Sequence, residues 1–274
     1  MKKIIYALSF LSILSLTSCD LFEMDNYDGP NAQISGRLID AKTGENIQIE
    51  TYSTAVWNWS TWPPTVEYTN AGSLIVVEEG WDAESDQAWM VKYNGDYEND
   101  LVFAGTYHSK TTELPCYPVS EQFVIKEGKN TKDFTLTPYG RVNDVNITYD
   151  SSTRKIKATF KVELGDASKA NRITNVRLLC NTSNYVSTSF NLCANDPGAR
   201  KNNVSPDTAI TLEIDTTADS NNEEFKYKRP HYLRIAALVQ GNNYNTSGWY
   251  NFSKTYVMSE DFSSVKEYDW SSAK

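Results

Sequence analysis

The sequence predicts an all-β protein built from two β-sandwich domains in tandem. Apolar and polar residues alternate over many short segments, which is the pattern of strands with one buried and one exposed face. Turn-rich segments containing Gly, Asn, Asp and Pro separate these runs, as in two-sheet sandwiches. The length of 274 residues allows two domains of about 100–150 residues each.

The N-terminal residues predict export and lipid attachment. Lys2 and Lys3 precede an apolar run, 4–16, that is shorter than the roughly 20 residues of a membrane-spanning helix. Leu16-Thr17-Ser18 directly before Cys19 is typical of the site that a bacterial lipoprotein signal peptidase cuts. We therefore expect a signal peptide over 1–18 and acyl chains on Cys19, which hold the protein on a membrane. The alternative is a buried N-terminal helix.

The acidic segment 19–30 contains Asn26, Gly29 and Pro30 and is interpreted as a flexible tether. Its carboxylates are similar to the signals that follow the lipid cysteine in some surface-exported lipoproteins, although an ordinary solvated linker has the same composition. Loss of the signal peptide changes the net charge from −9 to −11, because it removes two lysines. An acidic body repels phosphate backbones, which argues against nucleic acid as a partner.

Cys116, Cys180 and Cys193 remain once Cys19 carries lipid. Three is an odd number, so at least one thiol is free or pairs between chains. Export would allow a Cys180–Cys193 disulfide, which closes a loop of about 14 residues and contributes about 3 kcal/mol. The alternative is a buried reduced thiol, because Cys180 alternates with apolar Val176 and Leu178.

The first sandwich is expected over 31–139. Asn94-Gly95-Asp96 is a favourable hairpin turn, and Thr43-Gly44 predicts a turn with Gly at positive φ. The strand-like runs are 34–40, 74–77, 89–93, 101–107, 123–125 and 134–136.

The second sandwich is expected over 140–274 and has the more regular pattern. From Ile156 to Leu164, apolar residues alternate strictly with Lys, Thr and Glu, which predicts one buried and one wet face. The further runs are 176–180, 210–214, 233–239 and 250–258, with turn-rich segments at 165–170, 195–206 and 216–224.

Several motifs resemble known families. Gly36-x-Leu38-x-Asp40 with Thr43-Gly44, and Phe103-x-Gly105-Thr106-Tyr107, resemble transthyretin-like domains related to the carboxypeptidase regulatory domain. The segment 231–237 resembles the penultimate strand of fibronectin type III modules, with His231 where a tyrosine is usual.

The order of these motifs, from the lipobox through Gly80-Trp81, 94–97 and Thr137-Pro138-Tyr139 to 249–254, resembles an uncharacterised family of two-domain outer-membrane lipoproteins. The resemblance implies a lipid-anchored, surface-exposed protein associated with SusC/SusD-type glycan importers. It implies a role in glycan capture or uptake, and it implies no catalytic residue.

The most unusual composition lies at 56–64, where Trp57, Trp59 and Trp62 accompany Asn58 and two prolines. Exposed rings suit stacking on sugar faces, and Asn58 could supply directional hydrogen bonds. Alternatively, the rings pack at the sandwich end or against the other domain, or they contact a partner protein.

A second aromatic loop contains Tyr244 and Trp249, and it is the weaker candidate for ligand binding. Neither aromatic loop contains a residue pattern that is specific to catalysis.

Residues for catalysis or metal binding do not form a recognisable set. His108 and His231 lie outside any H-E-x-x-H pattern, and neither a G-x-S-x-G elbow nor a P-loop occurs. Carboxylates cluster at 78–86 and 96–100; paired carboxylates could hydrolyse glycosides or hold calcium, but solvated loop charge explains both groups better. We expect no metal, no cofactor and no enzymatic activity.

The sequence thus predicts a non-catalytic surface lipoprotein that helps a glycan importer by binding carbohydrate. The alternative is an accessory scaffold that binds an importer subunit and has no sugar ligand of its own.

Overall fold

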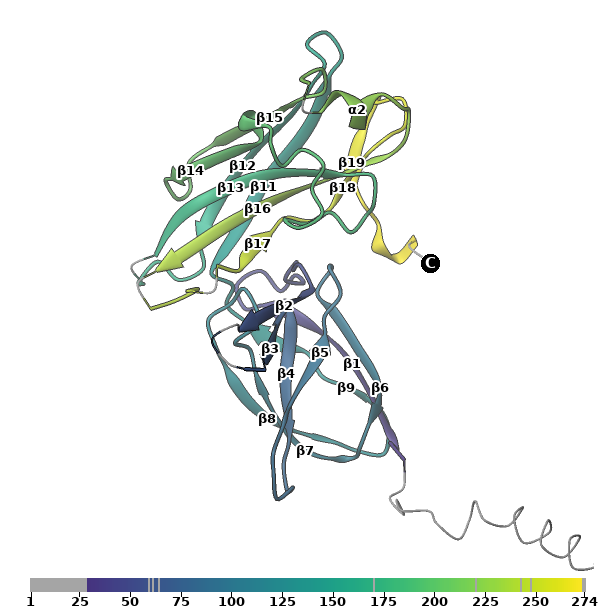
Figure 1. Cartoon of the computed structure of the whole chain (residues 1–274), viewed down its shortest axis with the longest axis vertical. Helices are drawn as coiled ribbons and strands as arrows, with labels where there is room; N and C mark the ends of the chain where they lie inside the picture. Colours follow the sequence, from purple (N-terminus) through teal and green to yellow (C-terminus); the bar gives the residue numbers. More distant parts are fainter. Residues whose placement is uncertain are drawn as a thin grey trace, which may run out of the picture.

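Strands form almost all of the regular structure, which confirms the predicted all-β tandem sandwich. The computed structural model describes residues 29–58, 60, 62–63, 65–169, 171–219, 221–241, 243–246 and 248–272, with the backbone alone over 52–58, 65–71, 171 and 222. The predicted signal peptide, Cys19 and most of the predicted tether lie outside these residues. Figure 1 shows two lobes, which we call the N-terminal sandwich (32–136) and the C-terminal sandwich (140–272).

The N-terminal sandwich has one sheet in the order β10-β1-β6, with β9 also on β1, and a second in the order β5-β4-β7-β8. A separate β2–β3 hairpin lies near the C-terminal sandwich (Figure 1). The strands are β1 (Ala32–Asp40), β2 (Tyr52–Asn58), β3 (Thr65–Ala71), β4 (Ser73–Glu78), β5 (Asp86–Met90), β6 (Asp96–Val102), β7 (Gly105–Lys110), β8 (Ser120–Ile125), β9 (Gly128–Thr131) and β10 (Phe134–Leu136).

Aromatic rings fill the core between these sheets. Trp89 is 4% exposed, and its ring centroid lies 6.1–6.3 Å from those of Tyr97, Tyr107 and Phe123. Gly36 in β1 has no space for a side chain, because a Cβ there would lie 1.7 Å from the carbonyl oxygen of Lys132. This close approach accounts for the glycine of the G-x-L-x-D motif.

The C-terminal sandwich packs the sheet β11-β12-β15 against the sheet β14-β13-β16-β18-β19, in which β17 also pairs with β16. A single-turn helix, α2 (Asn222–Phe225), and the 3₁₀ turns η1 (Pro197–Ala199) and η2 (Trp270–Ser272) complete it. The strands are β11 (Gly140–Asp150), β12 (Lys155–Leu164), β13 (Asn171–Asn181), β14 (Arg200–Val204), β15 (Ile210–Asp215), β16 (His231–Gly241), β17 (Tyr250–Phe252), β18 (Tyr256–Met258) and β19 (Val265–Glu267).

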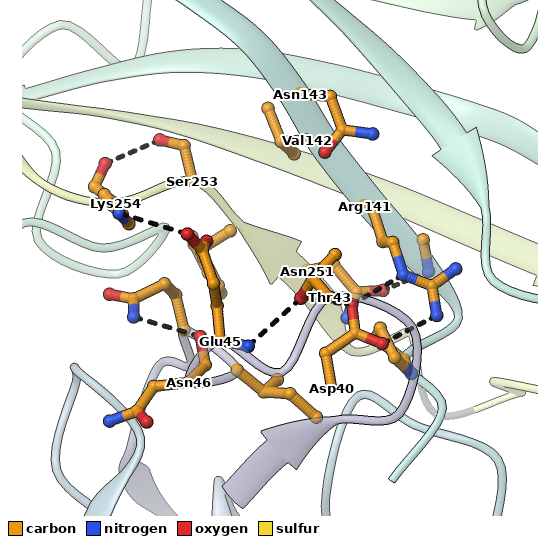
Figure 2. Close-up of a pocket in the computed structure, with 15 residues that line it drawn as sticks. Asp40, Thr43, Glu45, Asn46, Arg141, Val142, Asn143, Asn251, Ser253 and Lys254 are labelled. Carbon is orange, nitrogen blue, oxygen red and sulfur yellow. Dashed lines mark hydrogen bonds and ion pairs between the residues drawn. The ribbon is translucent and has the colours of Figure 1, made fainter.

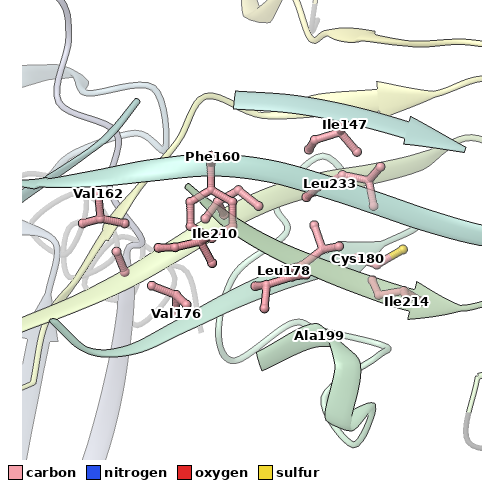
Figure 3. Close-up of a cluster of buried hydrophobic side chains, with 14 of the residues drawn as sticks. Ile147, Phe160, Val162, Val176, Leu178, Cys180, Ala199, Ile210, Ile214 and Leu233 are labelled. Carbon is pink, nitrogen blue, oxygen red and sulfur yellow. The ribbon is translucent and has the colours of Figure 1, made fainter. Parts of the chain in front are cut away.

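The predicted inner faces of this sandwich are confirmed. Ile156, Ala158, Phe160 and Val162 are all buried, and Figure 3 shows Phe160 and Val162 among apolar side chains from the other strands. His231, at the position where fibronectin modules have tyrosine, is fully buried. It stacks on Phe225 with ring centroids 4.6 Å apart, and its Nε2 lies 3.1 Å from the Glu224 carbonyl oxygen.

Several predicted boundaries were wrong in the N-terminal sandwich. Residues 52–58 and 65–71 form a hairpin, whereas the sequence predicts a loop over the tryptophan-rich segment 56–64. The run 101–107 divides into β6 and β7, because the Ala104 amide donates to Asn31 Oδ1 (2.8 Å) and turns the chain between them. The 94–96 turn is present, but the strands that flank it belong to different sheets.

Two boundaries were also wrong in the C-terminal sandwich. The turn-rich segment 195–206 contains β14, an edge strand whose exposed polar residues give no apolar alternation. The run 250–258 divides into β17 and β18 at Ser253. Its amide still donates to the Ile235 carbonyl oxygen (2.9 Å), but its own carbonyl oxygen accepts a hydrogen bond from Arg234 Nε (3.0 Å).

Buried polar contacts join the two sandwiches. Arg234 is fully buried, and its guanidinium donates to the carbonyl oxygens of Ile49 (2.9 Å) and Tyr93 (3.1 Å) in the N-terminal sandwich. Burial lowers the pKa of Arg234 to about 9. Asn251 Nδ2 donates to the Pro115 carbonyl oxygen (2.7 Å). The junction therefore satisfies buried backbone acceptors of one sandwich with side chains of the other.

Candidate functional site

The β2–β3 hairpin carries the tryptophan-rich segment at its closed end. The strands pair in register from Tyr52 opposite Ala71 to Asn58 opposite Thr65. Trp62, in the connection between them, is 91% exposed, so its ring is available to a ligand.

Of the other residues predicted in this segment, Trp57 and Asn58 end β2 but their side chains lie outside the described residues, as does all of Trp59. Their roles stay predictions.

The second predicted aromatic loop, 244–250, is organised by a buried asparagine. Asn245 has a φ of 52°, and its side-chain amide donates to the carbonyl oxygens of Val239 and Trp249, both at 2.7 Å. Its Oδ1 accepts from the Trp249 amide, also at 2.7 Å. These contacts hold the backbone of Trp249 in one position.

Tyr244 serves a different purpose from Trp249. Its half-buried ring meets Tyr117 edge-on, with centroids 5.2 Å apart, and the ammonium of Lys169 lies 4.8 Å from its centroid. Lys169 Nζ also donates to the Tyr244 hydroxyl at 3.3 Å. The face of Tyr244 is therefore already used by protein groups.

Trp249 lines a shallow hollow of about 20 Å³, or about 280 Å³ with its open mouth included, at the base of the β2–β3 hairpin. Gly72, which follows β3 directly, lines the same hollow; its φ is +73°, and a Cβ there would lie 2.2 Å from the Glu50 carbonyl oxygen. Glu113 also lines the hollow, and burial raises the pKa of its carboxyl. The structure thus brings Trp249 to the base of the hairpin that carries Trp62 at its tip.

A polar groove also runs between the two sandwiches (Figure 2). Its floor holds the buried ion pair of Asp40 with Arg141, in which Nε and Nη2 donate at 2.6 and 2.7 Å. Burial opposes ionisation of Asp40, but the hydrogen bonds from Arg141 lower the pKa of Asp40 below its usual value. Lys254 crosses the groove towards Glu45 at 3.7 Å. These charges face each other, so the groove is best explained as part of the junction.

The histidines and carboxylates have structural contacts. His108 lies within β7, which extends beyond the predicted end of the run 101–107, and its Nδ1 is 3.3 Å from Glu79 Oε1. Among the described residues, no group of three or more His, Cys, Asp or Glu side chains is arranged to hold a metal ion. The same part of the chain contains no helix long and apolar enough to cross a membrane.

Cys180 and Cys193 lie beside each other as buried thiols. Their side chains share a hydrogen bond, which together with burial raises the pKa of Cys180. The disulfide between them stays a prediction. Burial also raises the pKa of Cys116 to about 12.

Sequence reasoning overlooked Trp81 as a candidate site residue. It is 51% exposed and lines a hollow in the turn between β4 and β5. The sequence signal for this residue is Gly80-Trp81 followed by polar residues, a pair that also contributes to the family resemblance.

Comparison with solved structures shows which proteins share this fold. A candidate carbohydrate-binding protein from Bacteroides uniformis matches with a TM-score of 0.70 and 26% identity, over 84% of this chain and 100% of its own. This chain is similar to it over nearly all of both sandwiches.

Two DUF3823 family proteins share the fold at lower identity. The one from Parabacteroides merdae has a TM-score of 0.61 and 18% identity, over 83% of this chain and 98% of its own. The one from Bacteroides ovatus has a TM-score of 0.59 and 17% identity, over 82% of this chain and 97% of its own. No protein-family model and no curated protein matches the chain.

Proposed function

We propose that this protein is a non-catalytic carbohydrate-binding protein of the cell surface. The observation that carries the proposal is the similarity, over 84% of the chain, to the candidate carbohydrate-binding protein of Bacteroides uniformis. Trp62 at the hairpin tip supplies the face on which we place the sugar, and Trp249 at the hairpin base is a further contact for a longer chain.

The chemistry of the hairpin surface supports this proposal. Tryptophan presents a large flat face with a negative quadrupole, on which the C–H groups of a sugar ring can stack. Trp62 is nearly fully solvated in the free protein, so a ligand that covers it removes apolar area from water. The carboxyl of Glu113 can accept hydrogen bonds from sugar hydroxyls at the Trp249 hollow, whereas that of Glu50 is buried and already accepts from Thr188 Oγ1 (2.6 Å) and the Ser189 amide (3.1 Å).

The test is retention of the purified protein by polysaccharides in affinity electrophoresis. Wild type should be retarded by at least one glycan of a panel. Trp62→Ala should weaken that binding about tenfold, which corresponds to about 1.4 kcal/mol, because truncating a binding anchor typically costs this much or more. Tyr227→Ala is the matched control, since Tyr227 is also exposed (64%) but belongs to the C-terminal sandwich.

Two results would contradict the proposal. If no glycan changes the electrophoretic mobility of wild type, the proposed carbohydrate binding is wrong. Release of reducing sugar from a retained glycan would contradict the non-catalytic part.

We further propose that acyl chains on Cys19 anchor the protein to the outer membrane, with the two sandwiches outside the cell. The sequence before Cys19 supports this, as described above. Incorporation of a labelled fatty acid into wild type but not into Cys19→Ala is the expected result, and an unacylated wild type retaining residues 1–18 would contradict it.

An association with SusC/SusD-type importer subunits follows from the same proposal. It predicts that importer subunits co-purify after mild detergent extraction of membranes. If they co-purify while no glycan binds, the protein is an accessory scaffold without a sugar ligand.

A further inference from the structure

The turn between β4 and β5 contains a second aromatic hollow, remote from the hairpin. It measures about 790 Å³ including its open mouth. Trp81 is one wall and is half exposed, so the hollow combines a flat apolar face with polar groups. The residues that line it are Glu78, Trp81, Asp82, Ala83, Ser85 and Gln87.

Core aromatic residues hold two of the polar walls in place. Gln87, in β5, accepts a hydrogen bond on Oε1 from Trp89 Nε1 at 3.3 Å. Glu78, the last residue of β4, lies beside the hydroxyl group of the buried Tyr107, which is held by its hydrogen bond to the Phe103 carbonyl oxygen (2.8 Å). Because Trp89 and Tyr107 belong to the packed core, these two walls are positioned before any ligand arrives.

The other polar walls are available to a ligand. Within the part of the chain that the structure describes, the side chains of Asp82 and Ser85 are exposed and make no hydrogen bond or ion pair. Gly80 turns the chain just before Trp81 with a φ of +99°, and nothing lies within 4 Å of a Cβ at that position. The glycine therefore serves the turn and leaves the mouth of the hollow open.

Charge at the hollow narrows the class of ligand. Asp86 is neutralised by Lys110 at 2.7 Å, and Glu79 is engaged by His108 (3.3 Å) and by Gln122 Nε2 (2.7 Å). Glu78 and Asp82 then remain as acceptors that face the hollow without a cation. Carboxylates accept hydrogen bonds from hydroxyl groups and repel anions. The site therefore suits an uncharged sugar better than an acidic one.

The two aromatic hollows lie at opposite ends of the same strand. Gly72, just before β4, lines the Trp249 hollow, and Glu78, at the end of β4, lines the Trp81 hollow. At about 3.3 Å per residue, they are about 20 Å apart along the strand. Figure 1 shows the β4–β5 turn at the end of the N-terminal sandwich away from the C-terminal sandwich.

We propose that the Trp81 hollow is a second binding site for neutral sugars, which stack on Trp81 and hydrogen-bond to Asp82, Ser85 and Gln87. This proposal rests on the proposed function and adds a separate site to it. Two sites on one sandwich let a long glycan bind at both, so that the second contact is intramolecular and the overall affinity rises. A short oligosaccharide cannot benefit in this way.

The test compares Trp81→Ala and Trp62→Ala with wild type and with the Tyr227→Ala control. Affinity electrophoresis uses laminarin, xyloglucan, galactomannan and soluble starch as neutral polymers, and polygalacturonate as the acidic one. Isothermal titration then uses short oligosaccharides of the polymer that retards wild type. Trp81→Phe, which keeps an aromatic face, serves as the conservative variant.

We expect Trp81→Ala to weaken binding to the neutral polymer at least tenfold and to remove one of two sites in the titration. Trp62→Ala should retain the Trp81 site, and Trp81→Phe should bind within about threefold of wild type. If Trp81→Ala binds like wild type, the second site is wrong while the proposed function stands. If polygalacturonate binds and this binding depends on Trp81, the assignment of neutral sugars to the Trp81 hollow is wrong. If wild type binds no polymer, both proposals are wrong.

Discussion

The two sandwiches differ in where they place their aromatic and apolar side chains. In the C-terminal sandwich, strict alternation builds a core in which Ile156, Ala158, Phe160 and Val162 are all buried. In the N-terminal sandwich, aromatic rings serve both as core and as surface: Trp89 is 4% exposed, whereas Trp62 is 91% and Trp81 51%. Among the tryptophans whose side chains the structure describes, the two exposed by more than half both belong to the N-terminal sandwich.

This contrast teaches that the number of aromatic residues in a chain says little about recognition. What matters is whether a ring lies on a pleated inner face or in a turn. Trp89 alternates with exposed Ala88 and Met90 and therefore points into the sandwich, whereas Trp62 and Trp81 lie in connections between strands. We expect recognition to concentrate on the connections of the N-terminal sandwich.

The largest effect should come from breaking the junction that holds the two sandwiches together. Arg234→Ala leaves the buried carbonyl oxygens of Ile49 and Ser253 without their donor, and it leaves that of Tyr93 with the Ile49 amide alone. Such a loss should lower the free energy of unfolding by about 3–5 kcal/mol. Urea denaturation should then resolve two transitions where wild type shows one.

Arg172→Ala is the control for that experiment, because Arg172 is exposed on β13. It should unfold like wild type. An Arg234→Ala variant with wild-type stability would show that the sandwiches are held together by other contacts.

The junction also shows what could not be predicted from the sequence. Arg234 occupies a position in β16 where alternation alone predicts an outward, wet side chain, yet it is fully buried. At Arg234, the outer face of that strand contacts Ile49 and Tyr93 of the N-terminal sandwich, and a pattern along one strand contains no information about a second domain. The alternation of β12, by contrast, depends only on its own sandwich, so it was predicted correctly.

A smaller effect should follow pH and should belong to the C-terminal sandwich. Burial lowers the pKa of His231 below 6.5, since its ring stacks on Phe225. The unfolded chain therefore takes up this proton at a higher pH than the folded chain does. The contribution of the neutral His231 ring to the free energy of unfolding is fully present above about pH 6.5, the pKa of histidine in the unfolded chain. It is lost as the pH falls towards the lower pKa of the folded state, by at most about 1.4 kcal/mol per pH unit.

Urea denaturation of wild type and His231→Gln between pH 7.5 and 5 measures this difference. The fall in unfolding free energy should be steeper for wild type. Equal slopes would mean that His231 titrates alike in the folded and unfolded states, and that the pH response belongs to other groups.

The candidate site was predictable only in part, and the reason lies in side-chain environments. Composition singled out the tryptophan-rich segment, and Trp62 is indeed exposed. Composition could not separate Tyr244, whose face is covered by Lys169 and Tyr117, from Trp249, which lines a hollow. Those differences arise from neighbours that are distant in the sequence.

The smallest effects on stability should come from the two exposed tryptophans, and they separate recognition from folding most directly. Trp62→Ala and Trp81→Ala remove rings with few packing partners, so each should change the free energy of unfolding by less than about 0.5 kcal/mol. Trp89→Ala is the positive control and should cost about 3–5 kcal/mol, because it leaves a cavity among Tyr97, Tyr107 and Phe123. If Trp62→Ala or Trp81→Ala destabilises the fold as much as Trp89→Ala does, that ring belongs to the architecture, and its loss of glycan binding would then be a consequence of unfolding.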